Sequence, residues 1–122
     1  MNESHQKVSP FACIMDAIEP EKRPKHIANA KHLFHSIKEF RELPNGYAFR
    51  LPGDSEMVLK IAEFISLEKL CCPFFGFIVE VESEGGDAWL HLTGREGVKP
   101  FIQTEIAEFV GNNSVFPVKP FQ

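Results

Sequence analysis

The chain has 122 residues, of which 43% are hydrophobic, and this is the length and composition of one domain with a continuous core. Its net charge of -4 and the lack of a concentrated basic segment disfavour a nucleic-acid partner, because phosphate backbones select for a strong positive field. No apolar run approaches the roughly 20 residues of a membrane span, and the start of the chain lacks a signal-peptide pattern, so we expect a cytoplasmic protein that does not enter a membrane.

Residues 1–24 contain several prolines and predict an extended N-terminal arm rather than a helix. Within this arm, the segment 11–15 (Phe-Ala-Cys-Ile-Met) is too apolar to remain in water, so we expect it to lie against the rest of the chain. The rest, residues 25–122, is interpreted as a single α+β domain. Docking of the arm would carry Cys13 toward the other cysteines.

From Lys25 to about Glu42, apolar residues recur at spacings of three and four, which predicts an amphipathic helix. The segment 43–46 (Leu-Pro-Asn-Gly) is typical of a turn, and the alternation in 47–51 predicts a strand. Asp54 or Ser55 is then expected to cap a second helix, which continues to the cysteine pair and is stopped by Pro73.

Beyond Pro73, the pattern predicts two strands over 75–81 and 88–93, joined by a hairpin turn, and a last helix over 97–110. A further strand is predicted at 114–118. This order indicates an α+β fold in which an antiparallel sheet carries its helices on one face. It is the split βαβ, or ferredoxin-like, arrangement with an extra N-terminal helix.

In such a fold the other face of the sheet would carry Trp89 and His91. An uncovered aromatic face needs a cover, so the sequence predicts a homodimer through this open face, or a cover made by the N-terminal helix.

The most reactive stretch of the sequence is the adjacent pair Cys71 and Cys72, at the junction between a helical and a strand-like pattern. Adjacent cysteines cannot close an ordinary disulfide with each other without distorting the peptide between them. They are therefore free, bound to a metal, or paired with Cys13. In the cytoplasm, reduced thiols are the usual state.

A metal site is the first interpretation. Thiolates suit soft or borderline ions such as Zn, Cu or Hg, and Cys13, Cys71 and Cys72 with the imidazole of His91 would complete a tetrahedral set. The spacing is unlike the usual Cys-x-x-Cys. The alternative is therefore a metal-free structural or interaction domain, in which the cysteines are buried and inert.

A thiol–disulfide redox protein is the third interpretation, through a disulfide between Cys13 and one of the adjacent pair. The end of a helix raises a thiol pKa, which disfavours a reactive thiolate there, and we assign no catalytic residue. Glu68 lies one turn before the pair and can orient a ligand. His32 and His35 are spaced to share an ion on a helix but are typical of a solvated face, and His26 is interpreted as a surface residue.

Two sequence motifs indicate a resemblance to other proteins. The run 67–77 reads Leu-Glu-Lys-Leu-Cys-Cys-Pro-Phe-Phe-Gly-Phe, and upstream of it Cys13 precedes a Pro-x-x-Arg-Pro segment at 20–24. Together they resemble an uncharacterised family of small bacterial proteins. The resemblance implies that Cys13, Glu68, Cys71 and Cys72 act as one set. Because some relatives are encoded near heavy-metal resistance genes, it also favours soft metals.

Overall fold

A computed structural model describes residues 9–110 of the chain. Their elements are, in order, the 3-10 turns η2 (Met15–Ala17) and η3 (Pro20–Lys22), then α1 (Arg23–His35), β1 (Glu39–Leu43), β2 (Gly46–Leu51), α2 (Ser55–Cys71), β3 (Gly76–Val81), β4 (Ala88–Thr93) and α3 (Val98–Val110). Within this part of the chain, no helix has both the length and the apolar character needed to cross a bilayer.

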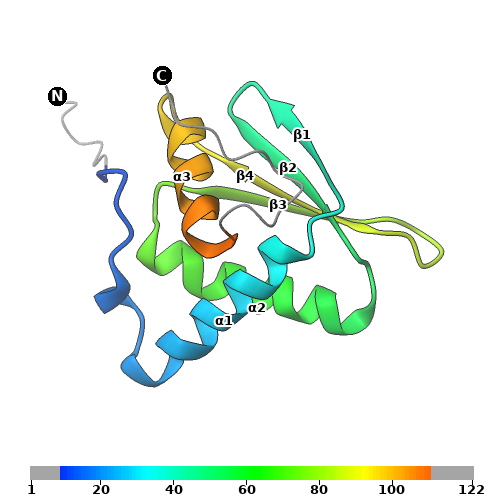
Figure 1. Cartoon of the computed structure of the whole chain (residues 1–122), viewed down its shortest axis with the longest axis horizontal. Helices are drawn as coiled ribbons and strands as arrows, with labels where there is room; N and C mark the ends of the chain where they lie inside the picture. Colours follow the sequence, from blue (N-terminus) through cyan, green and yellow to red (C-terminus); the bar gives the residue numbers. More distant parts are fainter. Residues whose placement is uncertain (1–8, 111–122) are drawn as a thin grey trace, which may run out of the picture.

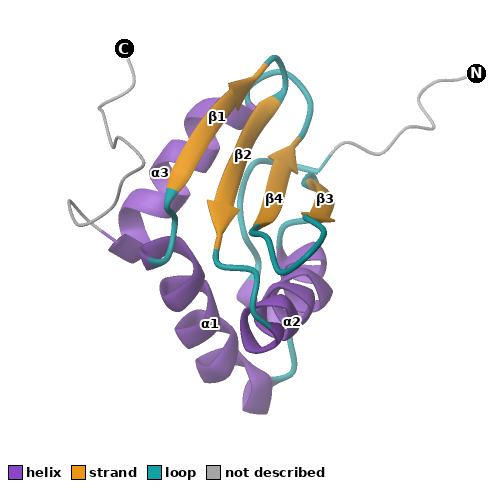
Figure 2. Cartoon of the chain, turned by 90° about the vertical axis from the view of Figure 1, so that its right-hand side faces the viewer, coloured by secondary structure: helices purple, strands orange, loops and turns teal. Residues whose placement is uncertain are grey.

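The four strands form one antiparallel sheet in the order β1-β2-β4-β3, with the three helices on one side of it (Figure 2). This confirms the α+β class and the antiparallel sheet predicted from the sequence. Figure 1 shows α1 and α2 side by side beneath the sheet, with α3 crossing beside them.

The predicted helix over 25–42 is correct only in its first part. Helix α1 ends at His35, because Ser36 caps it with hydrogen bonds to the carbonyl of His32, and residues 39–43 form β1 instead. β1 pairs with β2 across a tight turn, with Leu43 opposite Gly46. The turn at Leu-Pro-Asn-Gly was predicted, and it joins two strands rather than a helix and a strand.

The ferredoxin-like order stays a prediction, because its last strand was placed at 114–118, outside the described residues. In the described sheet, the position beside β2 is held by β1. β2 and β3 are joined through α2 and are separated by β4, so α2 leaves one central strand and returns at the sheet edge. α1 precedes the whole sheet.

The core lies between the sheet and the helices. Alternate residues of β2 and β4 point into it, as the two-residue period of a strand requires, and the helices contribute one face each. The largest fully buried side chains of the described core are Phe34, Phe49, Phe64, Ile18, Leu33, Leu51, Ile61, Leu90, Leu92, Ile102 and Ile106.

The opposite face of the sheet carries Trp89 and His91, as predicted, but Trp89 is only 5% exposed. The guanidinium of Arg41 lies 4.2 Å from the centre of the indole ring, and the indole N–H donates to Glu82 at 3.2 Å. Arg50 beside it is held by Glu39 and Asp87. The chain therefore covers its own tryptophan, and the homodimer through this face stays a prediction.

The N-terminal arm lies against the domain, as the apolar segment predicted (Figure 1). The ring of Phe11 packs edge-on against Phe74, with their centres 5.1 Å apart. Gly97 makes room for it, because its φ of 99° suits glycine and an added Cβ would lie 2.8 Å from the Phe11 ring. Ile18 is fully buried. The arm is thus part of the packed structure and fixes Cys13 between its two apolar anchors.

Candidate metal centre

Helix α2 positions the adjacent cysteines. Its first turn is capped by Asp54, whose carboxylate accepts from the backbone N–H of Met57 at 3.0 Å, as the sequence predicted. Its last residue is Cys71, and the N–H of Cys72 still donates to the carbonyl of Glu68. Pro73 has no N–H to continue the helix. Cys71 therefore has helical backbone, whereas Cys72 is the first residue to leave the helix.

The three sulfurs converge at this point. The Sγ atoms of Cys71 and Cys72 are 3.6 Å apart, and Cys72 is disulfide-bonded to Cys13, with the two Cα atoms 4.8 Å apart. The arm is held in position here by a hydrogen bond from the backbone N–H of Ile14 to the carbonyl of Cys71 at 2.8 Å. The sequence left open which cysteine would pair with Cys13, and the structure selects Cys72.

Two carboxylates and an imidazole surround the sulfurs. Among the described residues, three overlapping groups have ligand atoms within 4.8 Å of one another. The groups are Cys13 with Cys71 and Cys72; Cys13 and Cys72 with Glu68 and Glu105; and His26 with Glu68 and Cys71. Such spacings allow the members of a group to share one ion.

His26 is the imidazole of this cluster, and its interpretation as a surface residue is wrong. It is 3% exposed, stacks on Phe64, and places Nε2 2.8 Å from Oε1 of Glu68, which is equally buried. Its Nδ1 has no hydrogen-bond partner among the described residues. Glu68 is also 3.7 Å from the sulfur of Cys71, so the imidazole fixes a carboxylate that faces the thiol.

Glu105, from α3, closes the other side of the cluster. Its carboxylate oxygens lie 3.4 and 3.6 Å from Sγ of Cys13, so the reduced thiol would donate to it. Burial raises the pKa of Glu105 to about 8, and the charges of Glu68 and Glu108 add to this effect. At neutral pH the carboxyl of Glu105 is therefore largely protonated in the absence of a cation.

The thiol of Cys71 is also held in its neutral form. Burial raises its pKa to about 12, with further contributions from the negative charges of Glu68 and Glu105. The sequence predicted a raised thiol pKa from the end of the helix. The direction is right, but the main cause is burial, with added contributions from Glu68, which the sequence placed there, and from Glu105, which it did not.

The predicted set Cys13, Glu68, Cys71 and Cys72 is brought together, whereas His91 is not. His91 lies in β4 opposite Ala48 and Ile78, on the sheet face away from the helices, and belongs to none of the three groups. His32 and His35 lie on the exposed side of α1.

Sequence reasoning missed His26 and Glu105, although their positions carried a signal. His26 precedes the buried Ala30 and Leu33 by four and seven residues, so it continues the inner face of α1. Glu105 lies three residues after the buried Ile102 and one before Ile106. A polar residue at an inward helical position is either paired or functional, and these two meet at the thiols.

A cavity of about 320 Å³ opens beside the cluster. We call it the thiol cavity. The residues that line it are Cys13, Met15, His26, Ile27, Lys31, Glu68, Cys71, Glu105, Glu108 and Phe109. It connects the buried thiol of Cys71 to the surface between α1 and α3.

Comparison of the chain with protein-family models, curated proteins and solved structures gives no match. The function proposed below therefore rests on the geometry of the site.

Proposed function

We propose that the chain in its reduced form binds one soft or borderline metal ion, such as Zn, Cu or Hg, through Cys13, Cys71 and Cys72. The observation that carries the proposal is the convergence of the chain's three sulfurs, from two distant segments, beside the buried carboxylate of Glu68 and the half-buried carboxylate of Glu105. The disulfide accounts for the meeting of Cys13 and Cys72, whereas an inert core cysteine has no need to lie, as Cys71 does, against both that disulfide and a buried carboxylate.

The spacing of the sulfurs suits a shared ion. Two sulfurs on one tetrahedral zinc, each at a Zn–S distance of about 2.3 Å, are about 3.8 Å apart. Cys71 and Cys72 are already 3.6 Å apart. Once the bond between Cys13 and Cys72 is reduced, these two sulfurs need to move apart only slightly for all three sulfurs to bind one ion. Glu105 or Glu68 is placed to supply an oxygen as the fourth ligand.

The electrostatics of the cluster favour a cation. The burial and negative charge that raise the pKa of Cys71 and of Glu105 are costs of placing anions together without a counter-ion. A bound cation would instead favour the ionised thiols and carboxylates, because thiols deprotonate when they become metal ligands. His26 would act by orienting Glu68, as outer partners of metal ligands commonly do.

Binding requires the reduced protein. Two electrons and two protons convert the disulfide of Cys13 and Cys72 into thiols, and the ion then displaces the thiol protons. We expect a cytoplasmic thiol reductant, of the glutathione or thioredoxin kind, to supply the two electrons and to become oxidised to its own disulfide. The resemblance of the sequence motifs to a family with some members encoded near heavy-metal resistance genes agrees with a soft ion.

A thiol–disulfide function is the second candidate, favoured by the position of Cys71 3.6 Å from the sulfur of Cys72. Attack by a Cys71 thiolate on Cys72 would expel the thiolate of Cys13 and join two adjacent residues. The raised pKa of Cys71 and the geometry of adjacent cysteines both oppose this step. Metal binding is therefore the better supported function.

The test is a zinc titration of the fully reduced protein under anaerobic conditions, with a chelator of known affinity as competitor. We expect one ion per chain and the release of protons on binding. Serine in place of Cys13, Cys71 or Cys72 should each weaken binding by more than about a hundredfold, and His26→Gln by about ten- to a hundredfold.

His91→Ala is the matched control, because it removes an imidazole from the far face of the sheet and should leave the affinity unchanged. The proposal fails if the reduced protein binds no zinc, copper or mercury ion at micromolar concentration. It also fails if the three serine variants bind as tightly as the wild type. A redox protein would instead cycle its disulfide while binding no ion.

A further inference from the structure

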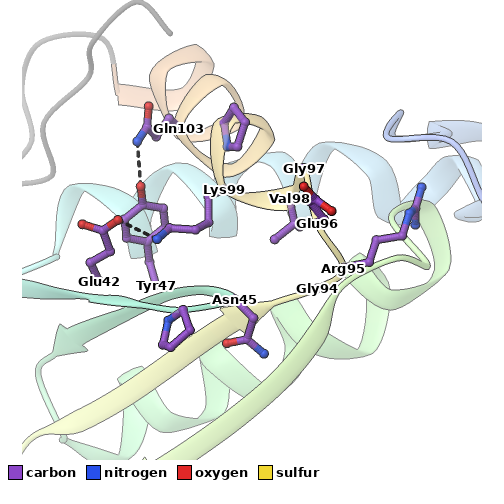
Figure 3. Close-up of a pocket in the computed structure, with 12 residues that line it drawn as sticks. Glu42, Asn45, Tyr47, Gly94, Arg95, Glu96, Gly97, Val98, Lys99 and Gln103 are labelled. Atoms are coloured by element: carbon purple, nitrogen blue, oxygen red, sulfur yellow. Dashed lines mark hydrogen bonds and ion pairs between the residues drawn. The ribbon is translucent and has the colours of Figure 1, made fainter. Parts of the chain in front are cut away.

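Three hollows of the described structure are large enough for a small molecule. One, of about 360 Å³ between α2 and Val79, has mostly apolar walls. The other two carry more polar groups and differ in what they offer to a ligand. The first, of about 560 Å³, lies between the β1–β2 turn and the start of α3 (Figure 3). Four of its polar side chains form two pairs: Lys99 with Glu42, and Gln103 with the hydroxyl of Tyr47. Arg95 is turned away to the carbonyl of Ser9. The second is the thiol cavity, which ends on reactive groups.

The thiol cavity has a polar floor and an apolar wall. Cys71, Glu68 and His26 are buried and form its inner end, whereas Ile27, Lys31 and Glu108 are exposed at its mouth. Half-buried Met15 and Phe109 line the space between. A ligand that enters from the surface therefore passes hydrocarbon before it reaches the sulfurs.

The cavity is much larger than a single ion requires. A water molecule takes about 30 Å³ of liquid and a dry cavity of about 150 Å³ accommodates benzene, so about 320 Å³ holds an ion together with a further group of ring size. The apolar wall favours a hydrocarbon group over water there.

The sulfurs differ in their access to this space. Cys13 and Cys71 line the cavity, whereas Cys72 does not and has no exposed surface. An ion with a bulky substituent would therefore meet Cys13 and Cys71 first, and the substituent would take the side of the ion that faces the cavity.

We propose that the reduced site binds a soft metal or metalloid centre that carries one organic substituent, with the centre on Cys13 and Cys71 and the substituent in the thiol cavity. The proposal rests on the function proposed above and specifies its ligand class. For a trivalent aryl arsenic oxide, two As–S bonds form, the As–O bonds break, and the two thiol protons leave with the oxygen as water. No oxidant or reductant is consumed.

The experiment compares phenylarsine oxide with arsenite on the reduced full-length chain, by affinity and by native mass spectrometry. Arsenite can take three thiols with the loss of three waters, whereas the phenyl compound takes two and leaves one thiol titratable. We expect phenylarsine oxide to bind more tightly than arsenite by on the order of tenfold, as burial of part of an aromatic ring provides.

Two variants locate the ring. Ile27→Trp fills the mouth of the cavity at an exposed helical position, and Met15→Gln keeps the size of the side chain but makes the wall polar. Each variant should lower the affinity for phenylarsine oxide by on the order of tenfold and change the affinity for arsenite by less than about threefold. Ile14→Trp is the control, because Ile14 is 52% exposed and does not line the cavity.

The outcomes separate the two proposals. One contrary result is that arsenite and zinc bind but phenylarsine oxide binds no more tightly than arsenite. Another is that Ile27→Trp lowers the affinity for both arsenicals equally. Either result would show that the organic substituent does not occupy the cavity, and only this inference would be overturned. If neither arsenical nor zinc binds the reduced protein, the metal centre and this inference are both overturned.

Discussion

The cysteine cluster and the outer face of the sheet, both singled out by the sequence, differ in how their polar groups are stabilised. At the candidate metal centre, a buried thiol, two carboxylates and an imidazole lie around a cavity, and the pKa values of Cys71 and Glu105 are raised. On the outer sheet face, Trp89 is covered by Arg41, and the charges around it are paired in solvent. The contrast teaches that a reactive region is marked by polar groups that burial has left in an unfavourable state, rather than by an unusual residue.

The largest change in stability is expected from loss of the disulfide that links the arm to the end of α2. The disulfide of Cys13 and Cys72 closes a loop across a sequence separation of 59 residues, so in oxidised protein Cys13→Ala should lower the free energy of unfolding by about 4 kcal/mol. Cys71→Ala should cost much less, because it leaves this loop closed. Urea unfolding in the presence and absence of reductant measures both.

The control is the reductant itself, because the wild type and Cys13→Ala should then have nearly the same stability. A loss of the same size in reduced protein would show that Cys13 contributes through packing and not through the covalent link.

The sequence predicted the meeting of the cysteines because that inference needed only an apolar arm and a proline at the end of a helix. It did not predict β1, because Ile37 and Phe40 continue the three-and-four spacing of the helix, whereas the apolar residues of β1, Phe40 and Leu43, do not alternate as those of a strand usually do. It also missed His26 and Glu105, since a polar residue among apolar ones on a helix is normally exposed at the edge of the buried face. Their roles depend on how α1 packs against both α2 and α3, which local periodicity does not encode.

The second effect concerns the buried pair of His26 and Glu68. His26→Leu would leave the carboxylate of Glu68 buried at 3% exposure without its partner, and we expect a loss of about 3 kcal/mol in the free energy of unfolding. The double variant His26→Leu with Glu68→Met should recover most of this loss, because two apolar groups replace both partners. Denaturant unfolding of the metal-free protein compares them.

His32→Leu, at an exposed position of the same helix, should be nearly neutral and serves as the control. If the single and double variants were equally unstable, the cost would come from packing rather than from an unpaired carboxylate.

The third effect is a pH dependence from Glu105. Its pKa is about 8 in the folded protein against an ordinary value of 4.5, so the folded state keeps a proton that the unfolded state has lost. The stability that this proton contributes is complete below about pH 4.5 and is lost as the pH rises toward 8. Glu105→Gln mimics the protonated carboxyl and should flatten the profile, with a gain on the order of 1 to 2 kcal/mol at pH 8 after allowance for solvent screening.

Thermal unfolding of metal-free protein from pH 5 to 8 tests this prediction. Glu80→Gln removes a carboxylate at an exposed position of β3, outside the cluster, and should leave the profile nearly unchanged. A stability that rises with pH in wild type but not in Glu105→Gln would mean that the carboxylate is stabilised in its ionised form, and the cluster would then not be short of positive charge.

The smallest effect belongs to the outer sheet face. Arg41→Ala removes the guanidinium above Trp89 and should cost about 0.5 kcal/mol, the value of a cation–π contact near solvent. Because Trp89 is the chain's one tryptophan, its fluorescence should shift to the red as water reaches the ring. The affinity for zinc should not change. If instead the emission stays fixed and sedimentation shows a dimer in which this face is protected, then a second copy covers Trp89, and the face is an interface rather than a self-contained surface.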